Sequence, residues 1–414
     1  MICKTKKVFI STSGCAMLHN ESQLYTDYFT KNGWETVSNL SKADFILLNL
    51  CSLNTERKIN HLNYINKIKQ AKSNGAFLAV TGCISTIASE EVRALTVDAS
   101  LEIKDIGDLD RILGSNVPLA RIEAPNVIKT NLLLTQIKVF LQGYLREKLL
   151  GLWKDPGLIY DILYQFNLPE EHKLSRAFSV MIAQGCMSKC SFCAIRIARG
   201  VVKSLPSKTI MQMITEGLKK GQTKIHLLAT NPCQYGHDIK GEIDYPDLLA
   251  RIDQLPWDFK IVLPDVEPDY FVNNFGRFRV ILTSKKFLEI TFAVQSASRP
   301  VLKRMHRYYD VEKFKECIKE LRAINATLKI NAHIMIGFPG ETYDDFTETF
   351  NLIKALDFNK VLLFPYGDLP HTESSGFLEH LDPKEIKKRM NTVYKYLVLS
   401  SFKRTLPRAR WRVF

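Results

Sequence analysis

The sequence lacks any long apolar run. No stretch of about 18 or more uninterrupted apolar residues occurs, and a membrane-spanning helix needs roughly that length. The opening residues, MICKTKKVFI, lead directly into a strand-like segment and lack the long apolar region and small-residue cleavage site of a signal peptide. Low-complexity and collagen-like repeats are absent too, and 46% hydrophobic with 24% charged residues is a globular composition. These absences exclude a fibre and a wholly disordered chain, and they predict a cytosolic protein without a membrane span.

Acidic residues are scarce relative to basic ones. The 414 residues contain 57 Lys+Arg and 43 Asp+Glu, which gives a net charge of +14. Such an excess indicates an anionic partner, although net charge governs solubility and encounter rates rather than fold. Residues 384–414 contain ten Lys or Arg and one acid, Glu385, and so carry +9 of the total. The excess is therefore a feature of the C-terminal segment.

The first 125 residues alternate short apolar strands with helical segments. Strand patterns cover residues 7–12, 45–50 and 76–81, and helical patterns cover residues 22–31 and 55–72. Residues 45–50 are almost wholly apolar, which is typical of a parallel strand covered on both faces. This alternation predicts a doubly wound parallel sheet of the α/β class for residues 1–125.

A second alternating region follows a helical linker or insertion, residues 126–176. Between residues 177 and 375, six strand patterns recur, mostly with helices between them, at 179–183, 224–229, 260–263, 288–294, 329–336 and 360–364. Six β/α units predict a full or partial (β/α)6 barrel, with an active site at the carboxyl ends of its strands. Residues 376–414 are expected to form a basic helix and tail.

Three of the nine cysteines lie close together in the sequence. Cys186, Cys190 and Cys193 follow the first predicted barrel strand with the spacing CxxxCxxC. Three thiolates at this spacing can hold three irons of a cubane cluster and leave the fourth iron open for a substrate or cofactor. The alternatives are a zinc site or three incidental thiols, but structural zinc uses four ligands and no obvious fourth lies nearby. The motif thus favours an iron–sulfur cluster.

Three earlier cysteines each follow a predicted strand of the first region. These are Cys15, Cys51 and Cys83. The carboxyl ends of parallel strands line one crevice, which is the usual ligand site of a doubly wound sheet. The three thiols can therefore converge on one metal centre, although three buried structural thiols remain the alternative.

Taken together, these motifs resemble those of a known family. CxxxCxxC with an aromatic residue, Phe192, before its last cysteine is similar to the signature of radical S-adenosylmethionine (SAM) enzymes. The wider pattern resembles the methylthiotransferases of that superfamily over roughly residues 7–125 and 178–375. The further matching stretches are Ser13-Gly14-Cys15, Asn49-Leu50-Cys51, Val80-Thr81-Gly82-Cys83, Ile197-Ala198-Arg199-Gly200, Val294-Gln295-Ser296, residues 301–305 and the GFPGET of residues 337–342.

The resemblance implies a radical SAM enzyme with two [4Fe–4S] clusters. Cys186, Cys190 and Cys193 would bind the cluster that chelates SAM, and the pocket for SAM would be shaped by Phe192, Gln295, Ser296, Gly337, Phe338, Pro339 and Gly340. Cys15, Cys51 and Cys83 would bind an auxiliary cluster that delivers sulfur. The implied reaction is methylthiolation of an unactivated C–H bond, and a one-electron donor such as flavodoxin or ferredoxin is the implied protein partner.

The sequence departs from the family at Leu18, at Leu50 and at residues 297–299, and two further departures bear on function. Cys233 occupies a loop after the second barrel strand, where the family rarely has cysteine, and a lone loop cysteine is inert more often than not. Members that modify tRNA or a ribosomal protein normally end in a small β-barrel, the TRAM domain. Only 47 residues follow Gly367, without an alternating β pattern long enough for that barrel. We therefore expect a basic segment where the TRAM domain would be.

Three functions remain open from the sequence. The leading one is a methylthiotransferase, with a tRNA adenosine as the favoured substrate. The second keeps the radical chemistry but acts on a peptide or natural-product intermediate without methyl transfer. The third is an iron–sulfur protein that binds RNA and is not an enzyme, and it rests on the basic charge alone.

Overall fold

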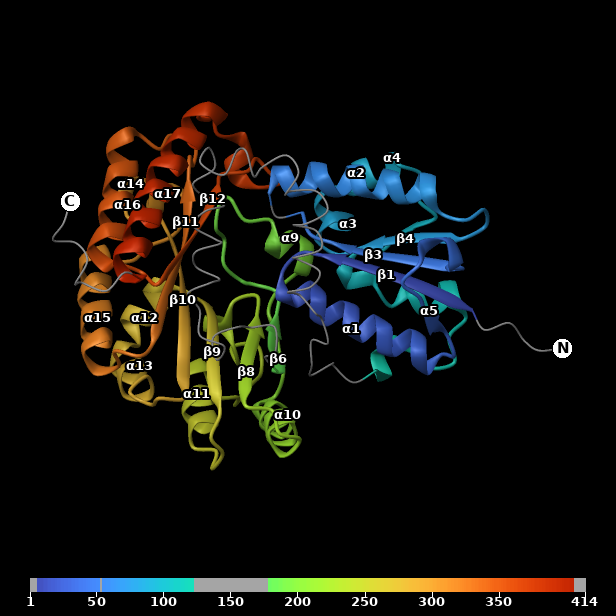
Figure 1. The fold of residues 1–414 in the computed structure, drawn as a ribbon, viewed down its shortest axis with the longest axis horizontal. Coiled ribbons are helices and arrows are strands. Elements are labelled where there is room, and N and C mark those ends of the chain that lie inside the picture. Colours follow the sequence, from blue (N-terminus) through green and yellow to red (C-terminus); the bar gives the residue numbers. More distant parts are fainter. Residues whose placement is uncertain (1–5, 53, 123–177, 406–414) are drawn as a thin grey trace.

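Two α/β units lie side by side in the structure (Figure 1). The computed structural model describes residues 6–52, 54–122 and 178–405. Each unit is built on one largely parallel sheet, of five and seven strands respectively, as the sequence predicts. The insertion expected at residues 126–176 and the end of the basic tail lie outside the described residues. Within the described ranges, none of the helices is both long enough and apolar enough to cross a bilayer.

The first unit is a doubly wound sheet, as predicted. Its strands are parallel and lie in the order β2-β1-β3-β4-β5. They span β1 (Lys7–Ser13), β2 (Glu35–Thr36), β3 (Phe45–Leu50), β4 (Phe77–Thr81) and β5 (Ala99–Ser100). One face packs on α1 (Ala16–Lys31) and α5 (Asp108–Leu113), and the other on α2 (Thr55–Ala71), α3 (Cys83–Ile87) and α4 (Ser89–Ala94). Figure 1 shows these helices above and below the sheet.

The first helix begins six residues earlier than its sequence pattern predicts. α1 starts at Ala16, directly after Cys15, and not at residue 22. The pattern is missed because the first turns bury the polar residues Asn20, Glu21 and Ser22. Tertiary contacts compensate that burial: the Asn49 side-chain amide donates to the carbonyl of Leu18 and to the Ser22 hydroxyl, both at 2.9 Å. Polar residues at buried helix positions thus hide the start of α1.

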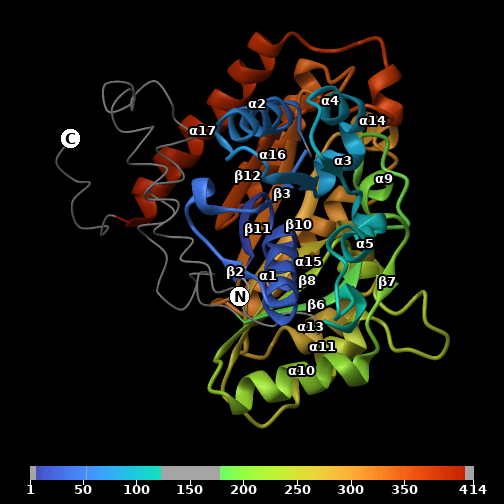
Figure 2. The same cartoon turned by 90° about the vertical axis from the view of Figure 1, so that its right-hand side faces the viewer.

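The second unit is an open, partial (β/α)6 barrel. Six parallel strands run in the order β12-β11-β10-β9-β8-β6, and the two-residue β7 (Lys203–Ser204) pairs antiparallel with β6. The six are β6 (Phe178–Gln184), β8 (Lys224–Ala229), β9 (Lys260–Val266), β10 (Phe287–Gln295), β11 (Lys329–Ile336) and β12 (Lys360–Pro365). In Figure 2 the first unit faces the viewer and this barrel lies behind it.

Helices cover one side of the barrel strands. They are α10 (Ser207–Lys219), α11 (Tyr245–Asp253), α12 (Pro268–Asn273), α13 (Phe275–Ile281), α15 (Val311–Ile324) and α16 (Tyr343–Leu356). Two further helices lie outside this core: α9 (Ile195–Arg199), which packs against the first unit, and α14 (Arg299–Arg304), which follows β10. Alternate strand residues such as Ile290, Phe292 and Val294 belong to the apolar core against this layer. Because strand side chains alternate between faces, Glu289 and Thr291 point to the opposite, inner face.

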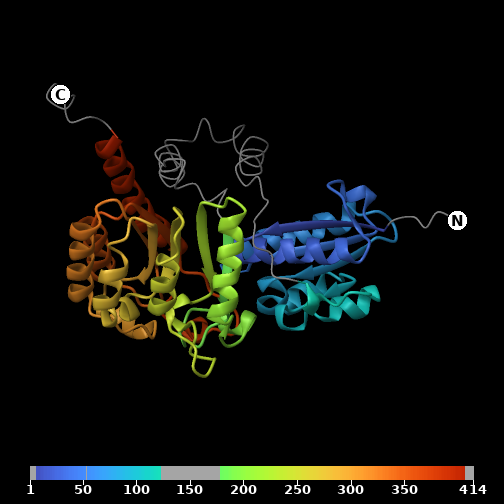
Figure 3. The same ribbon diagram turned by 90° about the horizontal axis from the view of Figure 1, so that it is seen from below.

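The described chain ends in a long helix that packs on the barrel. α17 (Pro383–Thr405) buries Ile386, Val393 and Leu397 in the same core as β11 and β12, and Figure 3 shows it projecting beside the barrel. Between β12 and α17, a short 3₁₀ helix (Glu373–Gly376) is the one regular element. The described residues after β12 therefore contain no strand, and the expected basic helix is present.

Candidate functional site

Three thiols gather at the carboxyl edge of the first sheet. Cys15 follows β1 and caps α1, Cys51 follows β3 directly, and Cys83 begins α3 after β4. β1 pairs with β3 and β3 pairs with β4, so the three strand ends are neighbours. The Cys51 N–H donates to the carbonyl of Ser13 at 2.9 Å. Parallel order thus brings together residues that are far apart in the sequence.

Two glycines allow this close approach. A Cβ on Gly14 would lie 2.9 Å from the Cβ of Cys51, which is closer than real Cβ contacts. Gly82 has a φ of +92°, and its Cβ would lie 2.5 Å from the carbonyl oxygen of Leu50. Glycine is the residue that adopts such a conformation without strain. The Ser-Gly-Cys and Gly-Cys pairs in the sequence therefore have a steric reason.

A buried ion pair lies beside these thiols. The Arg199 guanidinium contacts the Glu21 carboxylate, with Nη1 to Oε1 at 2.5 Å and Nη2 to Oε2 at 3.4 Å. Their side chains are only 4% and 5% exposed. Burial raises the pKa of Cys83 to about 12, and the positive charge of Arg199 acts against that increase. Arg199 thus supplies positive charge that favours the thiolate form of Cys83.

The second set of thiols lies in the loop after β6, at the carboxyl end of the barrel. Neighbouring segments brace this loop on both sides. The Met187 N–H donates to Gln234 Oε1 at 2.7 Å, and the Ser191 hydroxyl donates to the carbonyl of Arg304 at 2.7 Å. The Cys186 N–H donates to the carbonyl of Gly200 at 3.0 Å. Cys186, Cys190 and Cys193 are therefore held in a fixed loop.

Charged and polar side chains surround this second set. Asn231 Nδ2 lies 3.8 Å from Cys186 Sγ and 3.0 Å from Glu267 Oε1. Burial raises the pKa of Cys190, while the nearby Arg307 guanidinium lowers it. Nε of Arg307 is buried and has no hydrogen-bond partner among the described residues. Although Nη1 of Arg307 lies 3.7 Å from Glu267 Oε1, Nε remains a free donor near Cys190 and Cys193, and such a donor suits an anionic group.

The residues expected to shape a SAM pocket lie on three segments: the cysteine loop, the end of β10 and the GFPG turn. Phe192, in the cysteine loop, meets Phe338 edge to face with the ring centroids 6.4 Å apart. Gln295 ends β10 with a φ of +64°, a conformation that is unusual for a residue other than glycine. The Ser296 hydroxyl lies 3.1 Å from Thr349 Oγ1 on α16. The structure thus joins the cysteine loop to the GFPG turn, whereas the Ser296 hydroxyl points into the core.

The GFPG turn is fixed by Glu341, which belongs to the GFPGET motif, and by Arg389, which sequence reasoning missed. The Gly337 N–H donates to the Glu341 carboxylate at 2.5 Å, and a Cβ on Gly337 would collide with Ile386 of α17. Arg389 of α17 lies 3.2 Å from the same carboxylate. In the sequence, Arg389 is one basic residue among ten, and nothing there distinguishes it from its exposed neighbours.

Cys233 lies in the core of the barrel unit. Its side chain is 2% exposed and belongs to the main apolar cluster. The Glu267 N–H donates to its sulfur at 3.2 Å, and burial raises its pKa well above the usual value. These contacts describe a buried thiol.

The inner face of the barrel carries a further polar group of residues. Asp265 interrupts β9 with a φ of +54°, where the register with β10 shifts. Its carboxylate lies 3.0 Å from His333 Nδ1 on β11. His226 of β8 is 7% exposed, and the charge of Asp265 acts on it. These side chains come from three strands of one sheet.

We predict that His226 makes stability fall at acid pH. Burial lowers its pKa from 6.5 to about 4, although Asp265 opposes that shift. Below pH 6.5 the unfolded chain binds the proton first, so the free energy of unfolding decreases as the pH falls towards 4. Between pH 6.5 and 5 the loss should be roughly 2 kcal/mol. Urea unfolding of metal-free wild type and His226→Gln should show that the variant lacks this loss.

The matched control is His237→Gln, because His237 is exposed. The free energy of unfolding of His237→Gln should fall with decreasing pH in the same way as that of the wild type. If the stability of His226→Gln falls in parallel with the wild type between pH 6.5 and 5, the acid sensitivity belongs to other groups and the prediction is wrong.

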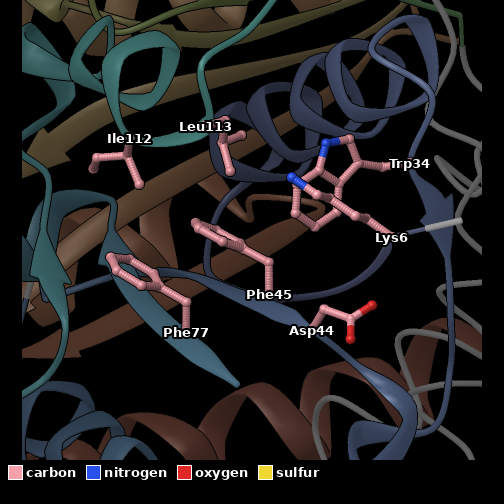
Figure 4. Close-up of a pocket in the computed structure, with 7 residues that line it drawn as sticks. All are labelled: Lys6, Trp34, Asp44, Phe45, Phe77, Ile112 and Leu113. Carbon is pink, nitrogen blue, oxygen red and sulfur yellow. The ribbon is translucent and has the colours of Figure 1, made fainter. Parts of the chain in front are cut away.

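A surface hollow of about 360 Å³ lies at the opposite edge of the first sheet. Figure 4 shows Phe45 and Phe77 next to each other, with Trp34 and Lys6 nearby. The two phenylalanine rings stack with centroids 5.2 Å apart, and Lys6 Nζ lies 5.3 Å from the Trp34 ring centroid. Because β3 and β4 begin here, this hollow is separated from the cysteines by the length of the strands.

Comparison with known proteins matches each unit to a protein family. Residues 7–102 match the uncharacterized protein family UPF0004, and residues 180–353 match the Radical SAM superfamily. A tRNA-2-methylthio-N(6)-dimethylallyladenosine synthase from Sulfurimonas denitrificans is 27% identical over 404 residues, which cover 95% of this chain and 83% of that relative. A synthase of the same name from Fusobacterium nucleatum is 25% identical over 400 residues, 96% of this chain and 85% of the relative. The two matches and these relatives fit a methylthiotransferase of the radical SAM superfamily.

Solved structures support the fold of this methylthiotransferase. The radical SAM methyltransferase TsrM from Kitasatospora setae, with cobalamin and a [4Fe–4S] cluster bound, has a TM-score of 0.58 at 12% identity. The match covers 89% of this chain and 77% of TsrM. A cobalamin-dependent radical SAM enzyme, OxsB, has a TM-score of 0.52 at 12% identity and covers 96% of this chain and 56% of OxsB. At these identities the likeness concerns the fold alone.

The residues present fit the cofactors of a methylthiotransferase. The Radical SAM match and these relatives identify an enzyme that uses SAM and [4Fe–4S] clusters. Among the described residues, no three His, Cys, Asp or Glu side chains are grouped so as to hold a single metal ion. A cubane cluster binds each thiolate to a different iron, so its ligands need not meet at one point. Two sets of three thiols, each with an arginine guanidinium nearby, suit such anionic clusters.

Proposed function

We propose that this enzyme methylthiolates a tRNA adenosine at an unactivated C–H bond. Cys186, Cys190 and Cys193 hold the cluster that binds SAM, and Cys15, Cys51 and Cys83 hold the auxiliary cluster that delivers sulfur. The observation that carries the proposal is the gathering of each cysteine set at the carboxyl edge of its own sheet, with α9 between the two units. The relatives named for a 2-methylthio-adenosine product support tRNA as the substrate.

The chain contributes positioning and exclusion of water. When bound, the clusters and SAM supply the electron, the sulfur atom and the methyl group. The braced cysteine loop fixes Cys186, Cys190 and Cys193, and Phe192 and Phe338 form an apolar wall beside it. Arg199 and Arg307 place positive charge next to buried thiols. Such preorganised charge in a water-poor site costs no rearrangement during the reaction.

A basic surface on α17 is the proposed contact for the tRNA backbone. Lys384, Lys387, Lys388 and Lys395 are exposed, while Ile386 and other apolar residues of the helix are buried. Lysine contacts with phosphates supply affinity that falls with salt and carries no sequence information. This surface lies on the helix that also supports the GFPG turn. A tRNA substrate also implies a cytoplasmic enzyme.

A one-electron donor completes the proposed reaction. A radical SAM enzyme needs such a donor, and flavodoxin or ferredoxin is the partner that we propose. Each delivers a single electron at low potential, which matches the requirement of a [4Fe–4S] cluster.

The decisive test is the mass of the product. The anaerobically reconstituted holoenzyme should be incubated with SAM, a reductant and tRNA from a strain that lacks methylthio-adenosine. One adenosine nucleoside should gain a methylthio group in place of hydrogen, and Cys186→Ala should give none. Cleavage of SAM without a methylthio gain in tRNA would favour the peptide or natural-product substrate. Absence of SAM cleavage would favour the non-enzymatic RNA-binding protein.

A further inference from the structure

One short helix, α9, contacts both candidate cluster sites. It begins two residues after Cys193 and ends at Arg199. Ala194 and Ala198 pack in one apolar cluster with Cys83, which begins α3 in the other unit. Figure 1 shows α9 between the barrel strands and the first sheet. A helix from the barrel unit therefore forms part of the wall around the N-terminal thiols.

The helix is tied to the other cysteine set at its end. The carbonyl of Gly200, directly after Arg199, accepts the N–H of Cys186 at 3.0 Å. A displacement of Arg199 would therefore also act on the loop that carries Cys186, Cys190 and Cys193. The two sites share a single rigid connection of about seven residues along the chain, from Cys193 to Gly200.

Arg199 reaches across the domain boundary to α1. Its two guanidinium nitrogens lie 2.5 and 3.4 Å from the two oxygens of Glu21. Glu21 lies on the helix that Cys15 caps, and both charges are almost completely shielded from water. The charge of Arg199 acts on Cys15 and on Cys83. A cation and an anion of one buried pair thus adjoin the same thiol set.

A fixed charge near a cluster changes its reduction potential. Reduction adds one negative charge, so a nearby cation stabilises the reduced form and a nearby anion destabilises it. The interaction is stronger where water is excluded. We propose that Arg199 and Glu21 are positioning residues that set the reduction potential of the auxiliary cluster from opposite directions. This inference rests on the proposed assignment of Cys15, Cys51 and Cys83 as ligands of that cluster.

The test is an anaerobic redox titration of the holoenzyme, monitored by electron paramagnetic resonance, with the iron content measured for each protein. In Arg199→Gln the reduced fraction of the auxiliary cluster at a fixed potential should fall at least about tenfold, which is 59 mV for a one-electron couple. Glu21→Gln should shift the potential in the positive direction. The double variant should return towards the wild type, and Arg199→Lys should lie close to it.

Opposite signs separate this role from a structural one. Loss of packing or of the domain contact would move both single variants in the same direction, and that result would overturn the proposal. So would an unchanged potential in both variants at full iron content. The matched control is Arg196→Gln, because Arg196 is exposed on the same helix and should leave both potentials unchanged.

The ligand assignment can fail separately. If the wild-type protein contains about four irons per chain and gives one cluster signal, it has no auxiliary cluster. That result would overturn this inference as well. Two clusters together with a shift of the wrong sign would overturn only the role of Arg199 and Glu21. If Arg199→Gln binds less iron than the wild type, the sign of the shift in Glu21→Gln decides.

Discussion

Replacing Cys15, Cys51 and Cys83 together by alanine is expected to halve the iron content after anaerobic reconstitution, from about eight to about four irons per chain. Methylthio transfer should be lost, whereas reductive cleavage of SAM should continue. The physical reason is that the two thiol sets belong to different sheets and are held by different loops. Removing one set leaves the hydrogen bonds around the other in place.

The complementary variant defines the second half of this experiment. Alanine at Cys186, Cys190 and Cys193 should also leave about four irons, but SAM cleavage should stop. The matched controls are Cys233→Ala and Cys317→Ala, since both thiols are buried outside the two sets. Both controls should keep the full iron content. Iron that stays unchanged in the Cys15, Cys51 and Cys83 variant would show that these thiols are structural.

The strands could be predicted from the sequence because apolar runs dominate them. β3, β8 and β11 occupy the residues that their patterns predict. The rules for parallel α/β units then predicted that the carboxyl ends of the strands in the first sheet line one crevice, and the structure places β1, β3 and β4 next to one another. The helix start at Ala16 was missed because Glu21 is a buried charge whose partner, Arg199, lies 178 positions away. No local pattern carries that contact.

The two cysteine sets could be predicted from the sequence for a similar reason, whereas their charged neighbours could not. Spacing and strand ends locate thiols, because both are properties of the local sequence. Arg307 and Glu267 meet from α14–α15 and β9–α12 connections at 3.7 Å, and this requires the tertiary fold. The net charge of +14 likewise does not show where the charged side chains lie in the fold. It counts Arg389, which is 7% exposed, together with lysines that face solvent.

Arg389→Ala is expected to cost about 3–5 kcal/mol of stability, because it leaves a buried carboxylate without its partner. The Arg389 guanidinium contacts the Glu341 carboxylate at 3.2 Å and the carbonyls of Glu341 and Thr342 at 3.1 Å each. Its Nε donates to Glu385 at 3.0 Å. Since Glu341 holds the GFPG turn through the Gly337 N–H, the affinity for SAM should also fall. Urea unfolding and SAM binding measure the two effects.

Lys388 provides the matched control, because it precedes Arg389 on α17 and is exposed. Lys388→Ala should change stability by no more than about 0.5 kcal/mol and leave SAM binding unchanged. If the lysine surface contacts tRNA, its removal should weaken binding and reduce the dependence on salt by about one phosphate contact. Equal destabilisation by the two variants would mean that α17 is a uniformly solvated basic helix. Unequal destabilisation would mean that Arg389 supports the GFPG turn, while the lysines of α17 are available to a polyanion.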